Sequence, residues 1–338
     1  MIKKIFKKQS KQKQELPTRI TNDTVAEHRE KVLAGGRKLK YPVQYTRSAL
    51  VRNTIIISAV ALVLLLGAVW AQLYFFKDTG DIAYRITKAT NTPVANIDGE
   101  LVPYSDYLLY YRASLAHIQN QTQASSDMPW DKINFQREQA MEKALRDAYA
   151  RKLAKEHNIN VSDERIDELV EKTRKSSGLS EKAYAAATRD NLNWTIDEMK
   201  IALKNDLLRQ EVAFAVDKDA LKITNQVVDL TNSGSSLADI AKSMGEKVSL
   251  VEGVVVPVGN ADGGLSEAVG KLDIGKVSAP IKTSATDGYY IAVRQQADTG
   301  YISYSYIKIP LTVFDKNFQQ LRKSNKTKVF INLEKQGS

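Results

Sequence analysis

The sequence predicts an α+β protein with a single transmembrane helix, a helical domain and a small antiparallel-sheet domain. Residues 54–76 carry no charged side chain, and as a helix they would reach about 34 Å, enough to cross a ~30 Å hydrocarbon core. Residues 104–210 repeat apolar residues at helical spacing. After residue 212, β-branched and aromatic runs typical of strands become frequent.

The charge distribution predicts the orientation of this span. The chain has 49 basic and 39 acidic residues, a net charge of +10. Residues 1–52 hold 14 of the basic and 4 of the acidic residues, so the part after the span is neutral. Basic residues beside a first span stay inside. We therefore expect a single-pass protein of the cytoplasmic membrane with its N-terminus inside and its larger part extracytoplasmic.

A cleaved signal peptide is the alternative interpretation, because Val69-Trp70-Ala71 ends in a small residue as a cleavage box does. However, residues 1–53 are a long basic tail, and the apolar run exceeds the usual ~7–15 residues of a signal peptide. Cleavage would leave a mature protein that begins at Gln72. We expect an uncleaved anchor.

The basic tail starts with six lysines and no acidic residue in residues 1–14, a composition that cannot fold alone. Such a segment binds anionic lipid, binds nucleic acid, or acts only as a topology signal. We expect membrane lipid as the partner of the span, with the tail as a second lipid contact, and no nucleic acid.

The residues of covalent and metal chemistry are scarce. No cysteine occurs, and the two histidines after the span, His117 and His157, lie 40 residues apart without metal-ligand spacing. Nucleotide-binding, serine-hydrolase and zinc-protease motifs do not occur. We expect no metal and no cofactor.

Local patterns then divide the rest of the chain. Residues 77–93 have no periodic apolar face and are interpreted as a linker, and Asp98-Gly99 predicts a hairpin turn. Four or five helices follow, the last opened by a capping box of Thr195 and Glu198. Further elements are expected, in order, as a strand over 212–216, a helix over 236–245, two strands around Asp287-Gly288, a strand over 302–309 and a helix over 314–323.

Several of these segments resemble the SurA, PrsA and PpiD group of exported foldases. VANIDGELVPYSDYLLYYRASL, HNINVSDERIDELVEK and LNWTIDEMKIALKNDLLRQEV are similar to the helical chaperone domain of that group, and the basic-flanked anchor is similar to PpiD in layout. GGLSEAVGKLDIGKVSAPIKT and DGYYIAVRQQ resemble a parvulin-type prolyl isomerase (PpiC) domain. The resemblance implies a tail (1–53), a span (54–76), a linker (77–93), a SurA-type domain (94–211), a parvulin-like domain (212–300) and a C-terminal strand and helix (301–338) that pack back on the exported part.

The resemblance fails where parvulins carry two histidines. Tyr290 stands at one of these positions, and the strand expected at 212–216 supplies no histidine for the other. If residues 304–309 form that strand instead, the matching position is Tyr306. The proline-pocket positions align near Ala261 and Leu265. We expect a degenerate domain without isomerase activity, because catalysis requires contacts that favour the twisted peptide bond.

The tyrosines of residues 104–111 form a stripe that predicts either core packing or an apolar cradle for unfolded chains. The candidate peptide-binding residues are Tyr104, Tyr107, Tyr110, Tyr111, Ala261, Leu265, Tyr289 and Tyr290. The sequence thus predicts an extracytoplasmic chaperone that binds unfolded or nascent exported polypeptides without ATP. Two alternatives stay open, an active peptidyl-prolyl isomerase and a structural type II envelope protein that binds one partner.

Overall fold

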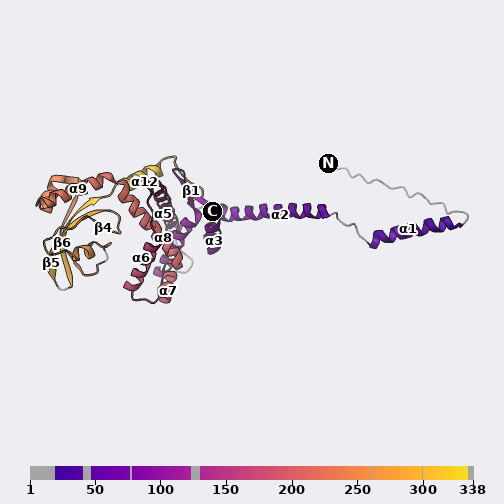
Figure 1. The fold of residues 1–338 in the computed structure, drawn as a ribbon, viewed down its shortest axis with the longest axis horizontal. Coiled ribbons are helices and arrows are strands. Elements are labelled where there is room, and N and C mark those ends of the chain that lie inside the picture. The colour runs from indigo at the N-terminus through magenta and orange to yellow at the C-terminus, as the bar shows by residue number, and fades with distance from the viewer. Residues whose placement is uncertain are drawn as a thin grey trace. The chain divides into compact units, whose positions relative to one another are not determined.

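The computed structural model describes residues 20–40, 47–76, 78–122, 130–260, 262–298 and 300–333. The chain divides into two units, residues 1–70 and residues 71–338. The first unit contains α1 (Asn22–Lys40) and α2 (Arg47–Trp70), both drawn in indigo to purple in Figure 1. Among the described residues, one helical stretch, Ala49–Phe75, is long and apolar enough to cross a membrane, and none of its most apolar window is buried.

The second unit begins with residues that the apolar run already contains. A short π-helical turn, η1 (Ala71–Phe75), places Leu73 in the core with 2% of its surface exposed. The hydroxyl of Tyr104 donates to the carbonyl of Leu73 at 3.0 Å, and the hydroxyl of Tyr74 donates to the carbonyl of Pro93. The end of the apolar run is therefore part of the folded unit.

The expected linker over residues 77–93 is wrong. Residues Asp81–Thr90 form helix α3, which buries Ala83, Tyr84 and Thr87 on one face. The helix is amphipathic but only ten residues long, and one of its three buried residues is a threonine. Thr87 is accommodated because its hydroxyl donates to the carbonyls of Ala83 and Tyr84 within the helix.

Five further helices form the body of what we call the helical domain, residues 71–216 and 312–333. They are α4 (Tyr104–Thr122), α5 (Trp130–His157), α6 (Asp163–Ser176), α7 (Glu181–Leu192) and α8 (Ile196–Val216). Ser162 and Ser180 cap α6 and α7 through their side chains, and the capping box of Thr195 and Glu198 is confirmed at the start of α8. These caps explain why the chain turns where it does.

A small sheet completes the helical domain. The hairpin of β1 (Pro93–Ile97) and β2 (Glu100–Pro103) turns at Asp98-Gly99, where both residues have positive φ, as the sequence predicts. A distant strand, β7 (Thr327–Val329), pairs with β1 on its other side, and the order is β2-β1-β7. Helix α12 (Val313–Lys323) precedes β7 and packs Phe314 and Phe318 against Tyr149.

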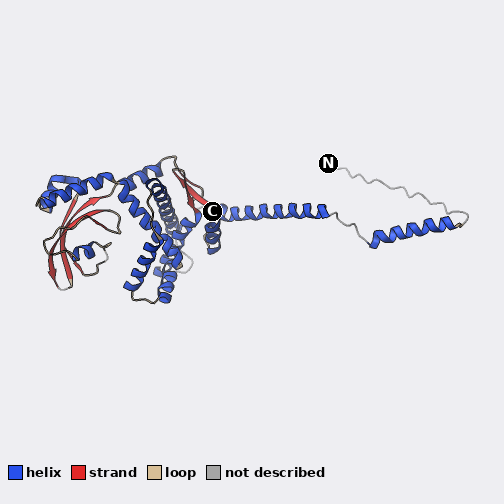
Figure 2. Ribbon diagram, in the orientation of Figure 1, coloured by secondary structure: helices blue, strands red, loops and turns tan. Residues whose placement is uncertain are grey.

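Residues 217–311 are the part of the same compact unit that contains the larger sheet, here called the sheet domain. Its strands are β3 (Ser249–Pro257), β4 (Ile281–Lys282), β5 (Gly288–Asp298) and β6 (Tyr301–Pro310), and its helices are α9 (Lys218–Asn232), α10 (Leu237–Met244) and α11 (Leu265–Gly270). The antiparallel order is β3-β6-β5-β4, shown in red in Figure 2. Helices α9 and α10 cover one face of the sheet, and α11 covers part of the other.

The strand expected over residues 212–216 is also wrong, because these residues continue α8. Val212 is fully buried, and the Phe214 ring lies 4.8 Å from that of Tyr289 in the sheet domain. Their β-branched and aromatic character reflects burial, since strand preference largely measures fit to a packed surface. Residues 301–310 instead supply the central strand β6 beside β5, so they belong to the sheet domain.

The overall class is α+β, as the sequence predicts: mostly helical, with small antiparallel sheets and one apolar helix near the N-terminus.

Candidate functional site

A groove of about 710 Å³ opens between α4, α5 and the α7–α8 connection of the helical domain. Its wall is mainly apolar, and its edge is charged. The lining residues are Tyr110, Ala113, Ser114, His117, Gln139, Ala140, Glu142, Lys143, Arg146, Leu192, Trp194 and Arg209. This size and mixture suit a side chain or a short stretch of polypeptide.

Trp194 provides the largest ring of the groove. Its indole N–H donates to the carbonyl of Leu109 at 2.8 Å, so its polar atom is satisfied inside the protein. The ring meets that of Tyr110 edge to face, with centroids 6.4 Å apart. Both rings are largely buried, with 4% of Tyr110 and 8% of Trp194 exposed, and they form part of the apolar groove wall with their polar atoms satisfied.

A buried network holds Tyr110 in place. Its hydroxyl donates to the carboxylate of Asp147, which is 1% exposed and also pairs with Arg209. The Asn205 amide donates to the Tyr110 oxygen at 3.3 Å. Burial, and then the Asp147 charge, raise the pKa of Tyr110 well above its ordinary value, so the phenol stays protonated.

The charged edge of the groove is internally paired. Arg146 bonds Glu142 and Asp315, while Lys143 lies 3.6 Å from Asp206 and 4.5 Å from the Tyr110 ring centroid. Arg146 and Arg209 also line a second cavity, of about 290 Å³, which reaches residues 284–286 of the sheet domain. The two cavities thus share a border formed by two arginines that are paired with acidic side chains.

The other three tyrosines of the stripe are packing residues. Tyr104, Tyr107 and Tyr111 are at most 3% exposed. The Tyr107 and Tyr111 rings stack at 5.7 Å, and those of Tyr104 and Tyr107 meet edge to face at 5.8 Å. Their burial corresponds to the core-packing interpretation. Tyr110 is 4% exposed and is packed as well, but it is the member of the stripe that lines the groove.

The sheet domain brings Tyr290 and Tyr306 together, the two positions where the sequence lacks histidines. Their ring centroids lie 5.3 Å apart on adjacent strands β5 and β6, and the Tyr304 ring follows at 6.1 Å from Tyr306. Leu265 of α11 packs in the same cluster. Tyr289 points to the opposite face, against Phe214, and Ala261 lies outside the described residues.

Asp287 and Lys308 complete this tyrosine face. The Tyr290 hydroxyl donates to the Asp287 carboxylate at 2.9 Å and 3.0 Å, and the Lys308 ammonium donates to the same carboxylate. Burial raises the pKa of Asp287, but the bonds from Lys308 and Tyr290 outweigh it and lower the pKa below its ordinary value. Burial, and then Asp287, raise the pKa of Tyr290. The phenol therefore stays neutral, and its proton is directed to Asp287.

Sequence reasoning missed Trp194, Asp287 and Lys308. Asp287 was interpreted only as a turn residue, although a side chain in a turn can also reach the adjacent strand. The alternation of Tyr304, Tyr306 and Lys308 on β6 places them on one face, and this signal could have found Lys308. Trp194 sits in the loop before α8, where the capping pattern drew the interpretation instead.

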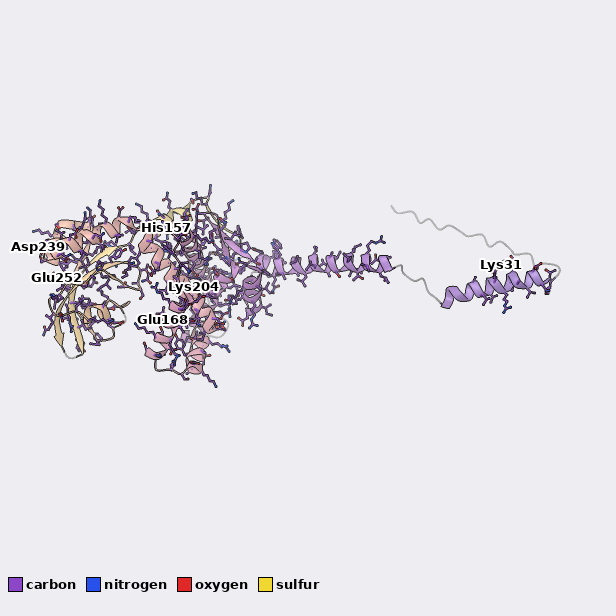
Figure 3. The ribbon with its side chains drawn as sticks, viewed as in Figure 1. Lys31, His157, Glu168, Lys204, Asp239 and Glu252 are labelled. Atoms are coloured by element: carbon purple, nitrogen blue, oxygen red, sulfur yellow. The ribbon has the colours of Figure 1, made fainter. Side chains whose placement is uncertain are left out.

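The two histidines after the span do not lie in a cluster of metal-ligating side chains among the described residues. His117 lies in the groove, and His157 lies exposed at the end of α5, well separated from the labelled Glu168 in Figure 3. Across the ranges that the structure describes, no group of histidine, aspartate and glutamate residues could hold a metal ion.

Comparison with known families identifies the helical part. Residues 44–213, half of the chain, match the family described as the SurA-like N-terminal domain. The match covers the apolar helix, the hairpin of β1 and β2, and the residues that line the groove. No curated protein matches the chain.

Proposed function

We propose that this chain, which belongs to the SurA-like N-terminal domain family, is a membrane-anchored extracytoplasmic chaperone that holds unfolded exported polypeptides without ATP. The observation that carries the proposal is the groove of the helical domain, which lies inside the matched region. Trp194 and Tyr110, both largely buried, form part of its apolar wall, and a border of paired charges surrounds it. Such a surface recognises apolar side chains with little regard to sequence.

The second cavity extends this proposed binding path. Arg146 and Arg209 line both cavities, and the loop at residues 284–286 closes the second one from the sheet domain. An extended client of a few residues spans about 3.3 Å per residue and would contact both domains at once. Contact with two domains supports holding, because a second contact on the same molecule raises the effective concentration of the first.

Retention at the membrane is supported by the family match and by the charge before the span. Leu73, two residues past the alternative cleavage point, is buried and accepts a bond from Tyr104, so the end of the apolar run also contributes to the fold. The matched region also includes the apolar helix. The basic residues before the helix support an N-terminus inside.

The sheet domain is proposed as a parvulin-like domain that has lost isomerase activity and contributes binding surface. Prolyl isomerisation has an uncatalysed barrier of about 18–20 kcal/mol, which only contacts to the twisted amide can lower. Here the Tyr290 proton is already directed to Asp287, and Lys308 is paired with the same carboxylate. These groups would have to break their bonds before they could assist a twisted amide.

The test is aggregation of a denatured exported protein in the presence of residues 71–338, a fragment that keeps Leu73 and Tyr74. We expect suppression at near-stoichiometric amounts with no ATP added. A proline-peptide assay on the same fragment is expected to give the uncatalysed rate. Strong acceleration in that assay would favour the isomerase alternative. Absence of suppression, together with a single stoichiometric crosslinked partner in cells, would favour the structural envelope protein.

A further inference from the structure

A polar pocket of about 250 Å³ in the helical domain adjoins the groove at Trp194, which lines both, and three arginines from three helices line it. Arg85 comes from α3, Arg112 from α4 and Arg189 from α7. The lining also contains two acidic residues, Asp81 and Glu198, so the charged side chains sum to a net positive charge. The proposed chaperone activity uses the groove and none of these three arginines.

Arg112 lies at the bottom and is only 8% exposed. Its guanidinium carbon lies 4.7 Å from the centroid of the Tyr84 ring, which fixes its plane. Nη2 is held by Asp81 at 2.6 Å and by the Asn193 carbonyl at 3.4 Å. The buried Nε and Nη1 atoms make no hydrogen bond, although Nη1 lies 3.5 Å from a Glu198 oxygen.

Two N–H donors of the buried Arg112 guanidinium thus have no hydrogen-bond acceptor among the described residues. A buried donor without a partner costs about 1–3 kcal/mol, and more when it is charged. Glu198 is already engaged elsewhere, because its Oε2 accepts from the backbone N–H of Thr195 at 2.7 Å. The two acidic residues therefore do not neutralise the three arginines of the lining, and an anion in the pocket would balance the remaining positive charge.

The rim supplies further free charge. Arg85 and Arg189 are exposed, and within the described residues their guanidinium groups have no ion pair and no hydrogen bond. An oxyanion in the pocket would be met by guanidinium groups from three elements. Guanidinium groups match the oxygens of a phosphate group in geometry as well as in charge.

The position of the pocket in the chain favours a membrane lipid as the source of such a phosphate group. Helix α3 starts at Asp81, five residues after Phe76 at the end of the apolar run, a separation of at most about 17 Å along the chain. Phe75, Phe76 and Ile82 expose 60%, 67% and 73% of their surface. Ile82 and Arg85 are three residues apart on α3 and so share a face. Exposed apolar residues beside free arginines are typical of a surface that meets lipid headgroups.

We propose that the pocket of Arg85, Arg112 and Arg189 binds the phosphate of an anionic membrane lipid on the extracytoplasmic face. The inference rests on the proposed anchoring of the chain, but it does not depend on chaperone activity. Binding would hold α3, and through Arg112 also α4 and the start of α8, at the membrane surface.

The experiment is residue-resolved footprinting of the full chain in nanodiscs with an arginine-specific dicarbonyl reagent. Modification rates of Arg85 and Arg189 are compared in phosphatidylcholine discs, in discs that also contain phosphatidylglycerol, and in phosphatidylcholine discs with added inorganic phosphate. If the lipid is present at about twice its dissociation constant, these rates should fall about threefold in the anionic discs only. Arg322, exposed on α12, is the internal reference and should not change.

A variant separates a site from general charge attraction. Arg85→Gln removes an exposed, unpaired side chain, so the fold should be kept, and the lipid protection of Arg189 should be lost. The matched control is Lys242→Gln, at an exposed position of α10 in the sheet domain, and in this variant the lipid protection of Arg189 should remain. Protection of Arg322 equal to that of Arg85, or protection that survives Arg85→Gln, would overturn the site.

Two further outcomes are decisive. Equal rates in all three media would overturn the proposal, and protection by inorganic phosphate alone would assign the pocket to a soluble anion and overturn the lipid assignment. The aggregation test is run on the soluble fragment without lipid, so its failure would count against the proposed function only. A signal sequence cleaved after Ala71 would be detected in the same footprinting experiment, as an N-terminal peptide beginning at Gln72.

Discussion

The backbone N–H of Thr312 donates to the side chain of Asp217 at 2.7 Å, which ties the point where the chain enters the sheet domain to the point where it leaves. The same carboxylate oxygen accepts from Val313 at 3.1 Å, and its other oxygen accepts from Ala220 at 2.9 Å. One buried side chain thus caps α9 and the start of α12 together.

Replacement of Asp217 with alanine should therefore remove two caps with one substitution. Each helix cap contributes about 0.5–2 kcal/mol, so we expect the free energy of unfolding to fall by about 2–3 kcal/mol. Urea unfolding of the full chain in detergent measures this. Asp219→Ala, at an exposed position in the first turn of α9, should change it by less than about 0.5 kcal/mol. Equal effects of the two variants would contradict the double-cap role.

Asp287 should make the stability of the sheet domain depend on acid pH. Its pKa in the folded protein lies below the ordinary 3.8, so its stabilising contribution is present above that value and is lost as the pH falls through the lowered pKa. Asp287→Asn should be less stable than the parent at neutral pH by about 0.5 kcal/mol, a small effect because the pair is partly exposed. The difference should vanish in strong acid.

Thermal unfolding across a pH series measures that difference. Asp273→Asn is the matched control, because Asp273 is an exposed aspartate of the same domain. A difference between Asp287→Asn and its parent that stays constant down to the acid limit would show that the carboxylate does not act through its charge.

A bulky residue in the groove should block clients without unfolding the helical domain. Ser114 is half-buried and lines the groove beside Tyr110. We expect Ser114→Trp to weaken binding of an unfolded polypeptide by about tenfold, or ~1.4 kcal/mol, measured by fluorescence titration. Ser176→Trp, on the exposed end of α6, adds the same ring elsewhere and should bind as the parent does. Unchanged binding by Ser114→Trp would place the client site outside this groove.

The contact of Tyr104 with Leu73 should stabilise the start of the helical domain. Tyr104→Phe keeps the ring contacts but removes the hydroxyl that donates to the Leu73 carbonyl. A buried hydrogen bond of this kind contributes about 1 kcal/mol, which differential scanning fluorimetry should register as a lower Tm. Tyr301→Phe changes a tyrosine that is 53% exposed and should leave Tm unchanged. The same Tm for both variants would indicate that residues 71–76 do not support the fold.

Local signals predicted most of the helical domain well. The turn at Asp98-Gly99 and the capping box of Thr195 and Glu198 depend on a few neighbouring residues, so the sequence alone contains what decides them. Phe214 was assigned to a strand because its neighbours are β-branched, whereas its place at the end of α8 is decided by two domains that pack around it. The residues that pack around Phe214 lie up to about 95 residues further along the chain, so no local pattern contains them.

The candidate site also combines features that local sequence predicts with features that distant contacts decide. The sequence predicts that Tyr290 and Tyr306 occupy corresponding positions on two strands, and their ring centroids lie 5.3 Å apart. The pairing of Asp287 with Lys308 depends on the register of β5 against β6, which no local pattern specifies. The tyrosine stripe was ambiguous for a different reason, because the same residue type serves cores and binding surfaces. Tyr107 and Tyr110 are both buried, and only Tyr110 lines the groove, a difference that no local pattern specifies.

The pairing of β7 with β1 has a consequence for the order of events at the ribosome. Ile97 pairs with Thr327, 230 residues further along the chain. At ~5–20 residues per second, the edge of β1 waits roughly 12–46 seconds for its neighbour to be synthesised. All strands of the sheet domain lie within that interval, so the later domain in the sequence can mature first. A protein proposed to shield unfinished chains thus leaves the edge of β1 unpaired during its own synthesis.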